Sequence, residues 1–239
     1  MLQRPSALSF IAFLIASIVI ATLSWLSLSN NLDMRIAAHY WDAEQGFYLK
    51  GTLLEQFFYY SINYSVRIFL IWTLIAYPIL RYLKPQIKRF DRIMMACFLV
   101  LAIGPGVIVN SIFKDNFGRP RPIQSEEFGG KLESRQLFEA NWGGKGKSFP
   151  SGHASVPLAF LIFACYLWRK AQRRNALILS AVTIIWYLGT SWARIVAGGH
   201  HFTDVSWAGF VAFVTVLLVD WLLLQAYVTP DGANNEAQT

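Results

Sequence analysis

The stretch Phe149-Pro150-Ser151-Gly152-His153 contains residue types that could do chemistry together. Pro150 has a fixed φ and no N–H, and the Ser151 hydroxyl can cap free backbone donors, so the sequence predicts a helix start here. Gly152 lets the backbone approach a ligand closely. The free N–H groups and positive dipole end of such a helix attract anions, phosphate above all. His153 places a titratable imidazole at the edge of this expected anion site.

A cationic segment precedes this stretch. It runs from Lys114 through Gly-Arg-Pro-Arg-Pro and ends with Arg121-Pro122. Arg119 and Arg121 each precede a proline, which favours extended backbone at both arginines and stiffens the segment. Contact with lipid headgroups is the other interpretation of such cations at a membrane surface.

A third segment follows the stretch. Arg194 stands six residues before His200, and Asp204 stands four residues after it. A carboxylate near an imidazole can fix its tautomer and stabilise its charged form. His201 is a rival to His200, but the spacing from Arg194 and to Asp204 selects His200.

Together these segments predict one phosphate site. The cations that would bind the phosphate oxygens are Lys114, Arg121 and Arg194. His153 and His200 would then approach the phosphate from opposite sides. Cys, His and carboxylate residues show no metal-ligand spacing, so we expect no metal or other cofactor.

The composition indicates that these segments are held by a membrane protein. Of the 239 residues, 55% are hydrophobic and 15% are charged, against about 25% charged in soluble domains. Apolar runs of roughly 20 residues recur, and each could cross a bilayer core about 30 Å thick. We therefore predict an all-α, polytopic membrane protein with six transmembrane helices and a single domain over residues 1–239. Cys97 and Cys165 fall inside these runs, so no disulfide framework is expected.

The expected spans cover residues 7–29, 62–80, 94–113, 154–168, 176–193 and 205–228. Gly104-Pro105-Gly106 predicts a kink in the third span, and Arg67 is expected near the membrane interface. The cluster Phe57-Phe58-Tyr59-Tyr60 predicts an interfacial belt or a short helix lying on the membrane. The polar tail 229–239 is expected to be disordered.

The basic residues set the predicted orientation. The net charge is +7, but the basic residues cluster in short loops beside apolar spans, which argues against a nucleic-acid partner. Loops 81–92 and 169–174 should face the cytoplasm, which places both the N- and C-termini there. Segments 114–153 and 194–204 then share one outer face.

The three motifs resemble those of the type 2 phosphatidic acid phosphatase superfamily. Its pattern is Lys-x6-Arg-Pro, then Pro-Ser-Gly-His, then Ser-Arg-x5-His-x3-Asp, and the order and spacings match over roughly residues 60–228. One departure is Ala193, where the family usually has Ser; the nearest serine is Ser191. One phosphate hydrogen bond, worth about 1–3 kcal/mol, is then missing or supplied by another group.

The resemblance implies a metal-independent phosphatase mechanism. His200 attacks phosphorus and forms a phosphohistidine, while Asp204 holds its other ring nitrogen. His153 protonates the leaving oxygen and later helps to activate water. The groups that the resemblance assigns to the phosphate oxygens are Lys114, Arg121, Ser151, Gly152 and Arg194.

The resemblance also implies a bacterial lipid phosphatase at the outer face of the inner (cytoplasmic) membrane. Envelope substrates fit, namely phosphorylated lipid A, undecaprenyl diphosphate or phosphatidylglycerol phosphate. The Gly-Arg-Pro-Arg-Pro…Phe-Gly-Gly stretch resembles the lipid A subgroup, so lipid A is slightly favoured. The alternatives are a lipid-to-lipid phosphotransferase and a non-enzymatic lipid-phosphate transporter, and a haloperoxidase-like use of the fold is less favoured. The sequence leaves open the oligomeric state and the role of residues 30–61.

Overall fold

The computed structural model describes residues 7–139 and 141–224, apart from the side chain of Arg89. Its α-helices are α1 (Ala7–Asn30), α2 (Leu32–His39), α3 (Leu53–Ile71), α4 (Tyr77–Leu83), α5 (Asp91–Leu101), α6 (Gly152–Ala159), α7 (Leu161–Arg169), α8 (Arg173–Val196) and α9 (Phe202–Val219). Wider or tighter helical turns are η1 (Trp72–Ala76), η2 (Pro85–Phe90), η3 (Ala102–Lys114), η4 (Pro122–Gln124), η5 (Glu126–Phe128) and η6 (Asp220–Leu224). Two short antiparallel strands, β1 (Trp41–Asp42) and β2 (Gly46–Phe47), form a hairpin. The predicted all-α fold is confirmed, and the predicted tail lies outside the described residues.

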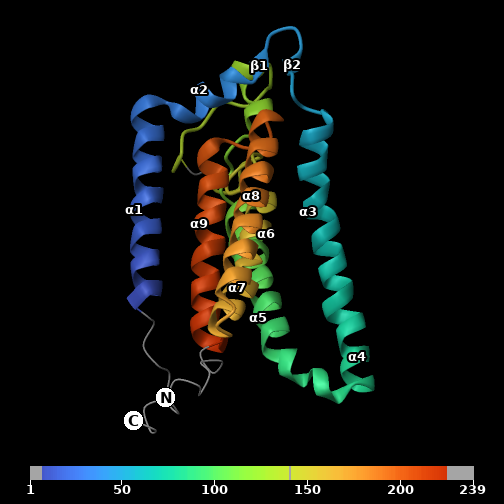
Figure 1. The fold of residues 1–239 in the computed structure, drawn as a ribbon. Helices are drawn as coiled ribbons and strands as arrows, with labels where there is room; N and C mark the ends of the chain where they lie inside the picture. Colours follow the sequence, from blue (N-terminus) through green and yellow to red (C-terminus); the bar gives the residue numbers. More distant parts are fainter. Residues whose placement is uncertain (1–6, 140, 225–239) are drawn as a thin grey trace.

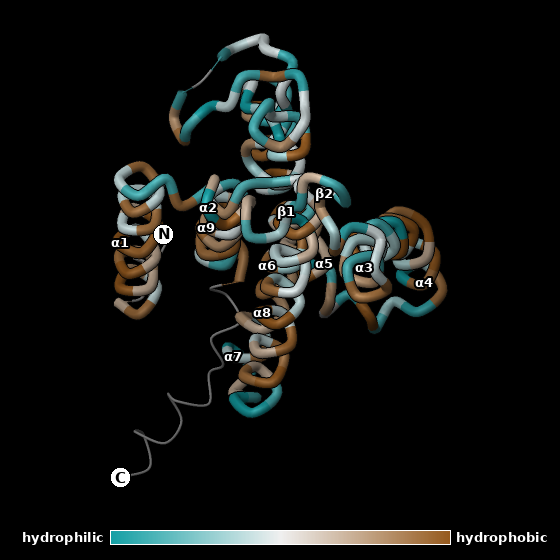
Figure 2. The backbone as a smooth tube through the Cα atoms, turned by 90° about the horizontal axis from the view of Figure 1, so that it is seen from above, coloured by the Kyte–Doolittle hydropathy of each residue, from teal (hydrophilic) through white to brown (hydrophobic). Residues whose placement is uncertain are grey.

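Within the described residues, five helices are long and apolar enough to cross a membrane. They are Ala7–Asn30, Leu53–Leu83, Asp91–Lys114, Arg173–Val196 and Phe202–Leu224. Figure 2 shows hydrophobic residues along these helices, with α1 and α3 on opposite flanks of a central group. The prediction of a polytopic membrane protein is confirmed.

The second span begins earlier than the hydropathy pattern predicted. The helix starts at Leu53, and Glu55 accepts the Gly51 N–H at 3.0 Å, which satisfies a free donor at this helix start. The cluster at residues 57–60 therefore belongs to the first turns of the spanning helix and is not a separate element. Arg67 consequently lies near the middle of the 31-residue helix Leu53–Leu83. Hydropathy alone missed this start because its first turns carry polar side chains.

The third span contains the predicted irregularity. Its α-helical turns give way to wide π-helical turns from Ala102 to Lys114, and Pro105 lies inside them. Proline cannot donate a backbone hydrogen bond, and such insertions are absorbed by local widening of the helix. The Asn110 amide donates to the Pro105 carbonyl at 2.6 Å, and its Oδ1 lies beside Gly152 at the helix start that carries His153.

The fourth span is two helices, where the apolar run predicted one. Pro157 lies inside α6, and the chain turns at Phe160 before α7 begins. The Phe160 N–H bonds to the Pro157 carbonyl at 3.0 Å, a tighter i→i−3 contact than an α-helix makes. Neither helix alone is long enough to qualify as a membrane span. The effect of Pro157 on this segment was missed.

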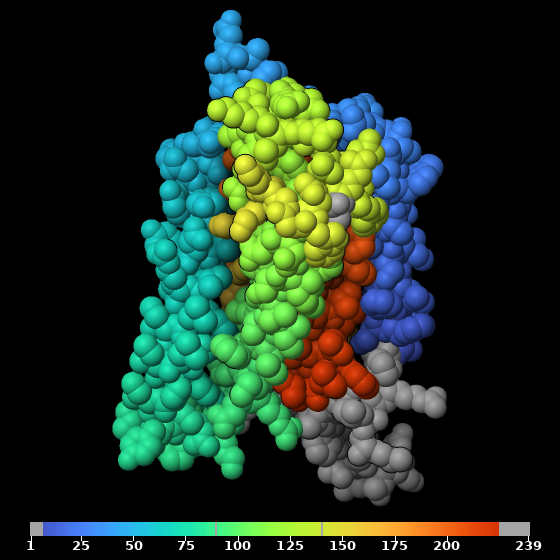
Figure 3. Space-filling view, turned by 180° about the vertical axis from the view of Figure 1, so that it is seen from behind, coloured from blue at the N-terminus to red at the C-terminus, as the bar shows by residue number. Residues whose placement is uncertain are grey.

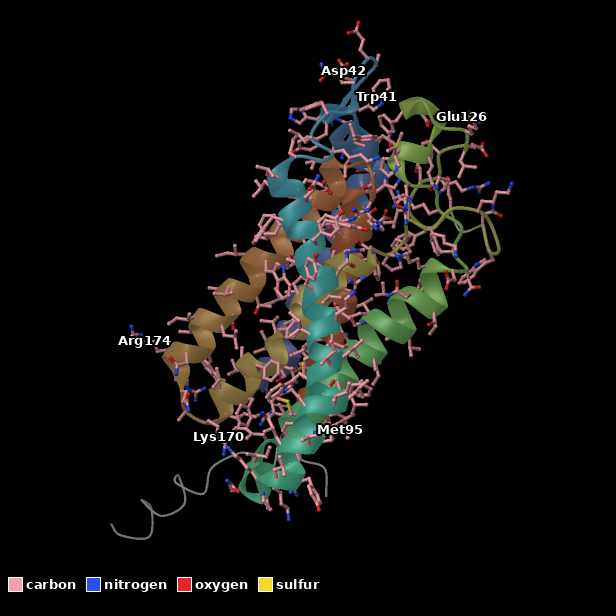
Figure 4. All side chains as sticks on the ribbon, turned by 90° about the vertical axis from the view of Figure 1, so that its right-hand side faces the viewer. Trp41, Asp42, Met95, Glu126, Lys170 and Arg174 are labelled. Atoms are coloured by element: carbon pink, nitrogen blue, oxygen red, sulfur yellow. The ribbon has the colours of Figure 1, made fainter. Side chains whose placement is uncertain are left out.

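The ends of the molecule differ in chemistry. Figure 1 places α2, the hairpin and the loop before α6 at one end, and the α4 turn and α7 toward the other. Figure 4 places Trp41, Asp42 and Glu126 at the first end and Lys170 toward the opposite one. The basic turns are partly neutralised by ion pairs, Arg81 with Asp91 at 3.2 Å and Arg169 with Asp220 at 2.6 Å. The motif-bearing segments therefore gather at the end away from the basic turns.

Small residues bring the central helices together. Ala96, Cys97 and Val100 of α5 are fully buried, as is Ala159 of α6. Side chains this small let the backbones approach closely, as in other helix–helix contacts within membranes. The close packing holds α5, α6 and α9 together beneath the polar end.

Candidate active site

The predicted helix start at Ser151 is confirmed. Ser151 precedes α6, and its hydroxyl accepts the Ala154 N–H at 3.4 Å. Its own N–H donates to the backbone oxygen of Asp204 at 3.1 Å, which ties this helix start to α9. A Cβ at Gly152 would lie 2.7 Å from Asn110 Oδ1, so only glycine fits here without displacing the Asn110 amide.

His200 lies in the short turn between α8 and α9, where it is 1% exposed. Its Nδ1 lies 2.7 Å from the backbone oxygen of Ser148, and a carbonyl oxygen can only accept a hydrogen bond. We infer that Nδ1 carries the ring proton, which leaves a lone pair on Nε2. The nearest oxygen of Asp204 is 3.8 Å from Nδ1, too far for a hydrogen bond. The direct partner of this ring nitrogen, expected to be Asp204, is therefore Ser148, and Asp204 acts on the ring at longer range.

Burial keeps the His200 imidazole neutral. It lowers the pKa of His200 from 6.5 to about 4, while the Asp204 carboxylate raises this pKa and the Arg194 charge lowers it. At pH 7 the ring is therefore in the neutral form that a nucleophile needs.

His153 lies against an aromatic side chain. Its imidazole stacks on the Tyr59 ring with centroids 4.7 Å apart, and the Arg194 guanidinium lies 4.9 Å from the centre of the same ring. His153 Nε2 is buried and has no hydrogen-bond partner in the described part of the chain. Tyr59 thus fixes the ring plane of His153 and leaves Nε2 free for a ligand.

The three predicted cations lie around the two imidazoles. The charges that act on His153 come from Arg194, His200, Lys114 and Arg121. Arg121 Nε and Arg194 Nε are buried without a hydrogen-bond partner among the described residues. Lys114 Nζ makes a long hydrogen bond to Asn110 at 3.4 Å. The structure therefore brings together the cations and imidazoles of all three motifs, with donors left free.

Glycine is required beside Arg194. A Cβ at Gly199 would come within 2.1 Å of Arg194 Nη2, so a larger residue would displace the guanidinium. Ala193, in place of the family serine, is fully buried. Ser191 lines a separate cavity with Tyr187 and Phe202, away from the cations, so it does not replace that serine.

The comparison with known families supports the motif assignment. Residues 93–226 match the model of the PAP2 superfamily. The chain belongs to this superfamily. It is a PAP2-family membrane phosphatase, as its motifs indicated, and the match includes all three motifs.

Individual relatives of this PAP2 phosphatase cover most of its length. A lipid A 4'-phosphatase of Francisella tularensis subsp. novicida is 28% identical over 86% of this chain and 93% of its own. A lipid A 4'-phosphatase of Rhizobium leguminosarum is 27% identical over 67% of this chain and 68% of its own. One of Rhizobium etli is 30% identical over 67% of this chain and 62% of its own. No solved structure matches the chain.

Two cavities of the phosphatase are lined by the three cations and His153. One of about 300 Å³ is lined by Lys50, Gly51, Glu55, Gln56, Tyr59, Tyr60, Arg121, Ile123, Arg194, Ala197 and Gly199. The other, of about 450 Å³, lies between α3 and η3 and reaches Lys114, Gly152 and His153 through mainly apolar side chains. The seam between α3 and η3 is visible in Figure 3, below the loop that covers this end. We call the first cavity the polar cavity and the second the apolar groove.

Four residues of the site were missed by sequence reasoning: Asp33, Tyr59, Arg119 and Ser148. Arg119 is 1% exposed, and its Nη1 donates to Asp204 at 2.6 Å while its Nη2 donates to Asp33 at 2.7 Å. The Ser148 hydroxyl donates to the second oxygen of Asp204. One signal for Asp33 and Arg119 is that a lone acid and an extra arginine lie beside predicted membrane spans. Tyr59 follows a Thr-x-x-Glu pattern at Thr52–Glu55, which is typical of a helix start.

The charge around the site comes from side chains. In residues 7–139 and 141–224, no three His, Cys, Asp or Glu side chains lie where they could hold one metal ion. Charge on a bound phosphate would be met by Lys114, Arg121 and Arg194.

Proposed function

We propose that this phosphatase hydrolyses a phosphomonoester of a lipid A-type lipid and that His200 is its nucleophile. The observation that carries the proposal is a set of buried nitrogen atoms that have no hydrogen-bond partner among the described residues. Arg121 Nε, Arg194 Nε and His153 Nε2 are buried beside His200 without a partner in the described residues. Leaving such groups unpaired costs free energy that a bound phosphate would recover. The names of the relatives favour lipid A within the family.

The first half of the reaction uses the free lone pair of His200. Nε2 attacks phosphorus in line, and the bond from phosphorus to the lipid oxygen breaks. His153 takes the proton of the bound phosphate monoester and gives it to that oxygen, so the lipid leaves as an alcohol. Lys114, Arg121 and Arg194 meet the charge on the equatorial oxygens, and the Ser151 hydroxyl and Gly152 N–H are placed to add hydrogen bonds.

The second half releases phosphate. Water gives its proton to the now neutral His153 and attacks the phosphohistidine, and the bond from phosphorus to Nε2 breaks. His200 regains its lone pair while its Nδ1–H stays on the Ser148 carbonyl, 2.7 Å away. Inorganic phosphate takes the water-derived proton from His153 as it leaves, so each group returns to its starting protonation state.

The two cavities fit the two ends of such a substrate. The polar cavity offers a carboxylate, an amide and two tyrosines, the groups that bind sugar hydroxyls, at Glu55, Gln56, Tyr59 and Tyr60. The apolar groove fits acyl chains and leads to Lys114 and His153. We infer that the lipid enters sideways through the seam between α3 and η3, with its sugar in the polar cavity.

The proposed topology has six crossings. The helices α6 and α7 together cover Gly152–Arg169, about 27 Å at 1.5 Å per residue, which is close to the thickness of a bilayer core. They would form the crossing between η3 and α8. Basic residues in the turns at 81–92 and 169–174 favour a cytoplasmic location for that end. Both termini would then be cytoplasmic and the site would face the outside of the inner membrane.

Phosphate release from a panel of purified lipids tests the proposal. The panel contains lipid A, undecaprenyl diphosphate and phosphatidylglycerol phosphate, offered to the wild type, His200→Ala and His153→Ala. We expect release from lipid A, with at least about a 10⁴-fold loss for His200→Ala and about 10²–10⁴-fold for His153→Ala. Full activity of His200→Ala would overturn the assignment of His200 as the nucleophile. Radioactive phosphate on a second lipid instead of in solution would indicate phosphotransfer.

A further inference from the structure

Asp204 is held by groups other than the three phosphate cations. Its two oxygens accept hydrogen bonds from Arg119 Nη1 at 2.6 Å and from the His201 N–H at 2.8 Å, besides the Ser148 hydroxyl. Asp204 is fully buried, and Arg119 is the cation that pairs with it. A carboxylate this buried needs such partners to stay ionised.

Arg119 is itself fixed by an acid from the N-terminal quarter of the chain. Asp33 of α2 is 4% exposed and receives Arg119 Nη2 at 2.7 Å. The same carboxylate accepts the Thr203 N–H at 2.9 Å, so it also satisfies a free donor in the first turn of α9. The remaining Arg119 donor, Nε, bonds to the backbone oxygen of Arg135 at 3.1 Å. This guanidinium therefore has one orientation.

Backbone contacts connect this cluster to the nucleophile. The Ser148 N–H donates to the Arg119 carbonyl at 2.9 Å, and the Ser148 carbonyl accepts from His200 Nδ1 at 2.7 Å. The Arg119 backbone therefore holds Ser148, whose carbonyl bonds to His200, and the Arg119 side chain holds the Asp204 carboxylate.

We propose that Asp33 and Arg119 are positioning residues of the phosphatase, with Asp33 holding Arg119 and Arg119 holding Asp204 and Ser148 against His200. The proposal rests on the proposed role of His200 as nucleophile. Neither residue lines the polar cavity or the apolar groove. Arg119 also offsets the negative charge of Asp204, so that the carboxylate stabilises the His200 ring without drawing a proton onto Nε2.

The charge balance predicts opposite effects for the two residues. The titratable and charged groups that face His200 are Asp204 from α9, Arg194 from α8, Lys114 from η3 and His153 from α6. Removing the Arg119 charge leaves Asp204 uncompensated, so the pKa of His200 rises from about 4 and the ring protonates at higher pH. Removing the Asp33 charge leaves Arg119 paired with Asp204 alone, so the pKa of His200 stays or falls.

The test compares Arg119→Gln, Arg119→Lys and Asp33→Asn in the purified full-length protein. The pH profile of kcat/KM and the thermal midpoint are measured for each, with lipid A as the substrate. Arg174→Gln and Asp42→Asn are matched controls, because both side chains are exposed and both residues lie outside this cluster. Substrate ionisation is common to all variants, so only differences between profiles count.

We expect Arg119→Gln to lose about 100-fold in kcat with little change in KM, since the phosphate cations are intact. The acidic limb of its pH profile of kcat/KM should move to higher pH by about one unit. Arg119→Lys keeps the charge, so it should lose kcat with its acidic limb unmoved. Asp33→Asn should lose about tenfold in kcat, with its limb unmoved or lower.

Two results would overturn the inference. One is a loss of activity in Arg119→Gln that only follows the unfolded fraction, with the acidic limb unmoved. The other is Asp33→Asn with wild-type kcat. If Arg119→Gln does not fold, Asp33→Asn and Arg119→Lys decide the question through kcat alone. Failure of the proposed function is separate, because it appears as an active His200→Ala protein whatever these variants do.

Discussion

Arg119 and Arg121 stand two residues apart in one extended segment, each before a proline, and have opposite environments. Arg119 is 1% exposed and bonded to two carboxylates. Arg121 has a buried Nε with no partner in the described residues and lines the polar cavity. Pairing therefore distinguishes an arginine that holds the site from an arginine that is free to bind substrate.

Truncating each arginine should separate the two roles. Arg121→Ala should lower kcat/KM by about 10²–10³-fold, because it removes a cation aimed at the transition-state charge, while the free energy of unfolding changes by less than about 0.5 kcal/mol. Arg119→Ala should cost about 3–5 kcal/mol of stability, because it leaves two buried carboxylates unpaired. Thermal unfolding measures the stability of each variant, and lipid A hydrolysis measures its kcat/KM. Similar stability losses for the two variants would contradict the contrast.

A phosphate mimic measures the same difference at the anion site. Vanadate should inhibit the enzyme and stabilise it on binding, by about 2.7 kcal/mol at 100 times its Kd. For a chain of this size that is about 5–10 °C in thermal midpoint. Arg121→Ala should lose most of the shift at the same vanadate concentration, whereas Arg174→Gln should keep it. A full shift in Arg121→Ala would mean that Arg121 does not face the bound anion.

A third arginine extends the comparison into the membrane. Arg67 lines the apolar groove from the middle of its helix and has no acidic partner within the described residues. We expect Arg67→Leu to raise KM for lipid A about fivefold, the equivalent of about 1 kcal/mol, through lost contact with acyl carbonyl oxygens. Arg67→Lys is the control, and KM for a short, water-soluble phosphomonoester should not change. An equal change in KM for both substrates would contradict the proposal that the lipid binds in the apolar groove.

Chelation is expected to have the smallest effect. If the three cations meet the phosphate charge, incubation with EDTA followed by gel filtration should leave kcat/KM within about twofold of the untreated enzyme. Loss of activity that is restored by one divalent metal would contradict the metal-independent mechanism.

The sequence predicted the parts of the site whose physics is local. The start at Ser151 depends on a few neighbouring residues, and the spacing of Arg194, His200 and Asp204 fits one tight turn between two helices. Both follow from residues that are close together in the chain. The polytopic fold followed in the same way from the apolar runs.

The missed parts depend on contacts between distant segments. Asp33 reaches Arg119 and Thr203 across 86 and 170 positions of the chain, and its position beside a span does not reveal which residues it meets. Tyr59 was assigned to a belt because hydropathy placed the helix start at residue 62, after its polar turns. The break after α6 was missed because the span was predicted from its apolar composition alone, without regard to Pro157 inside it.

Trapping the covalent intermediate tests the role of His200 most directly. The enzyme is mixed with lipid A labelled with ³²P at the scissile phosphate and quenched in alkali within milliseconds, and the labelled peptide is sequenced. We predict an alkali-stable, acid-labile label on His200 of the wild type and no label in His200→Ala. The label should accumulate in His153→Ala, because His153 activates the water that attacks the phosphohistidine. Label on His201, or turnover with no trapped label in the wild type and in His153→Ala, would contradict a phosphohistidine at His200.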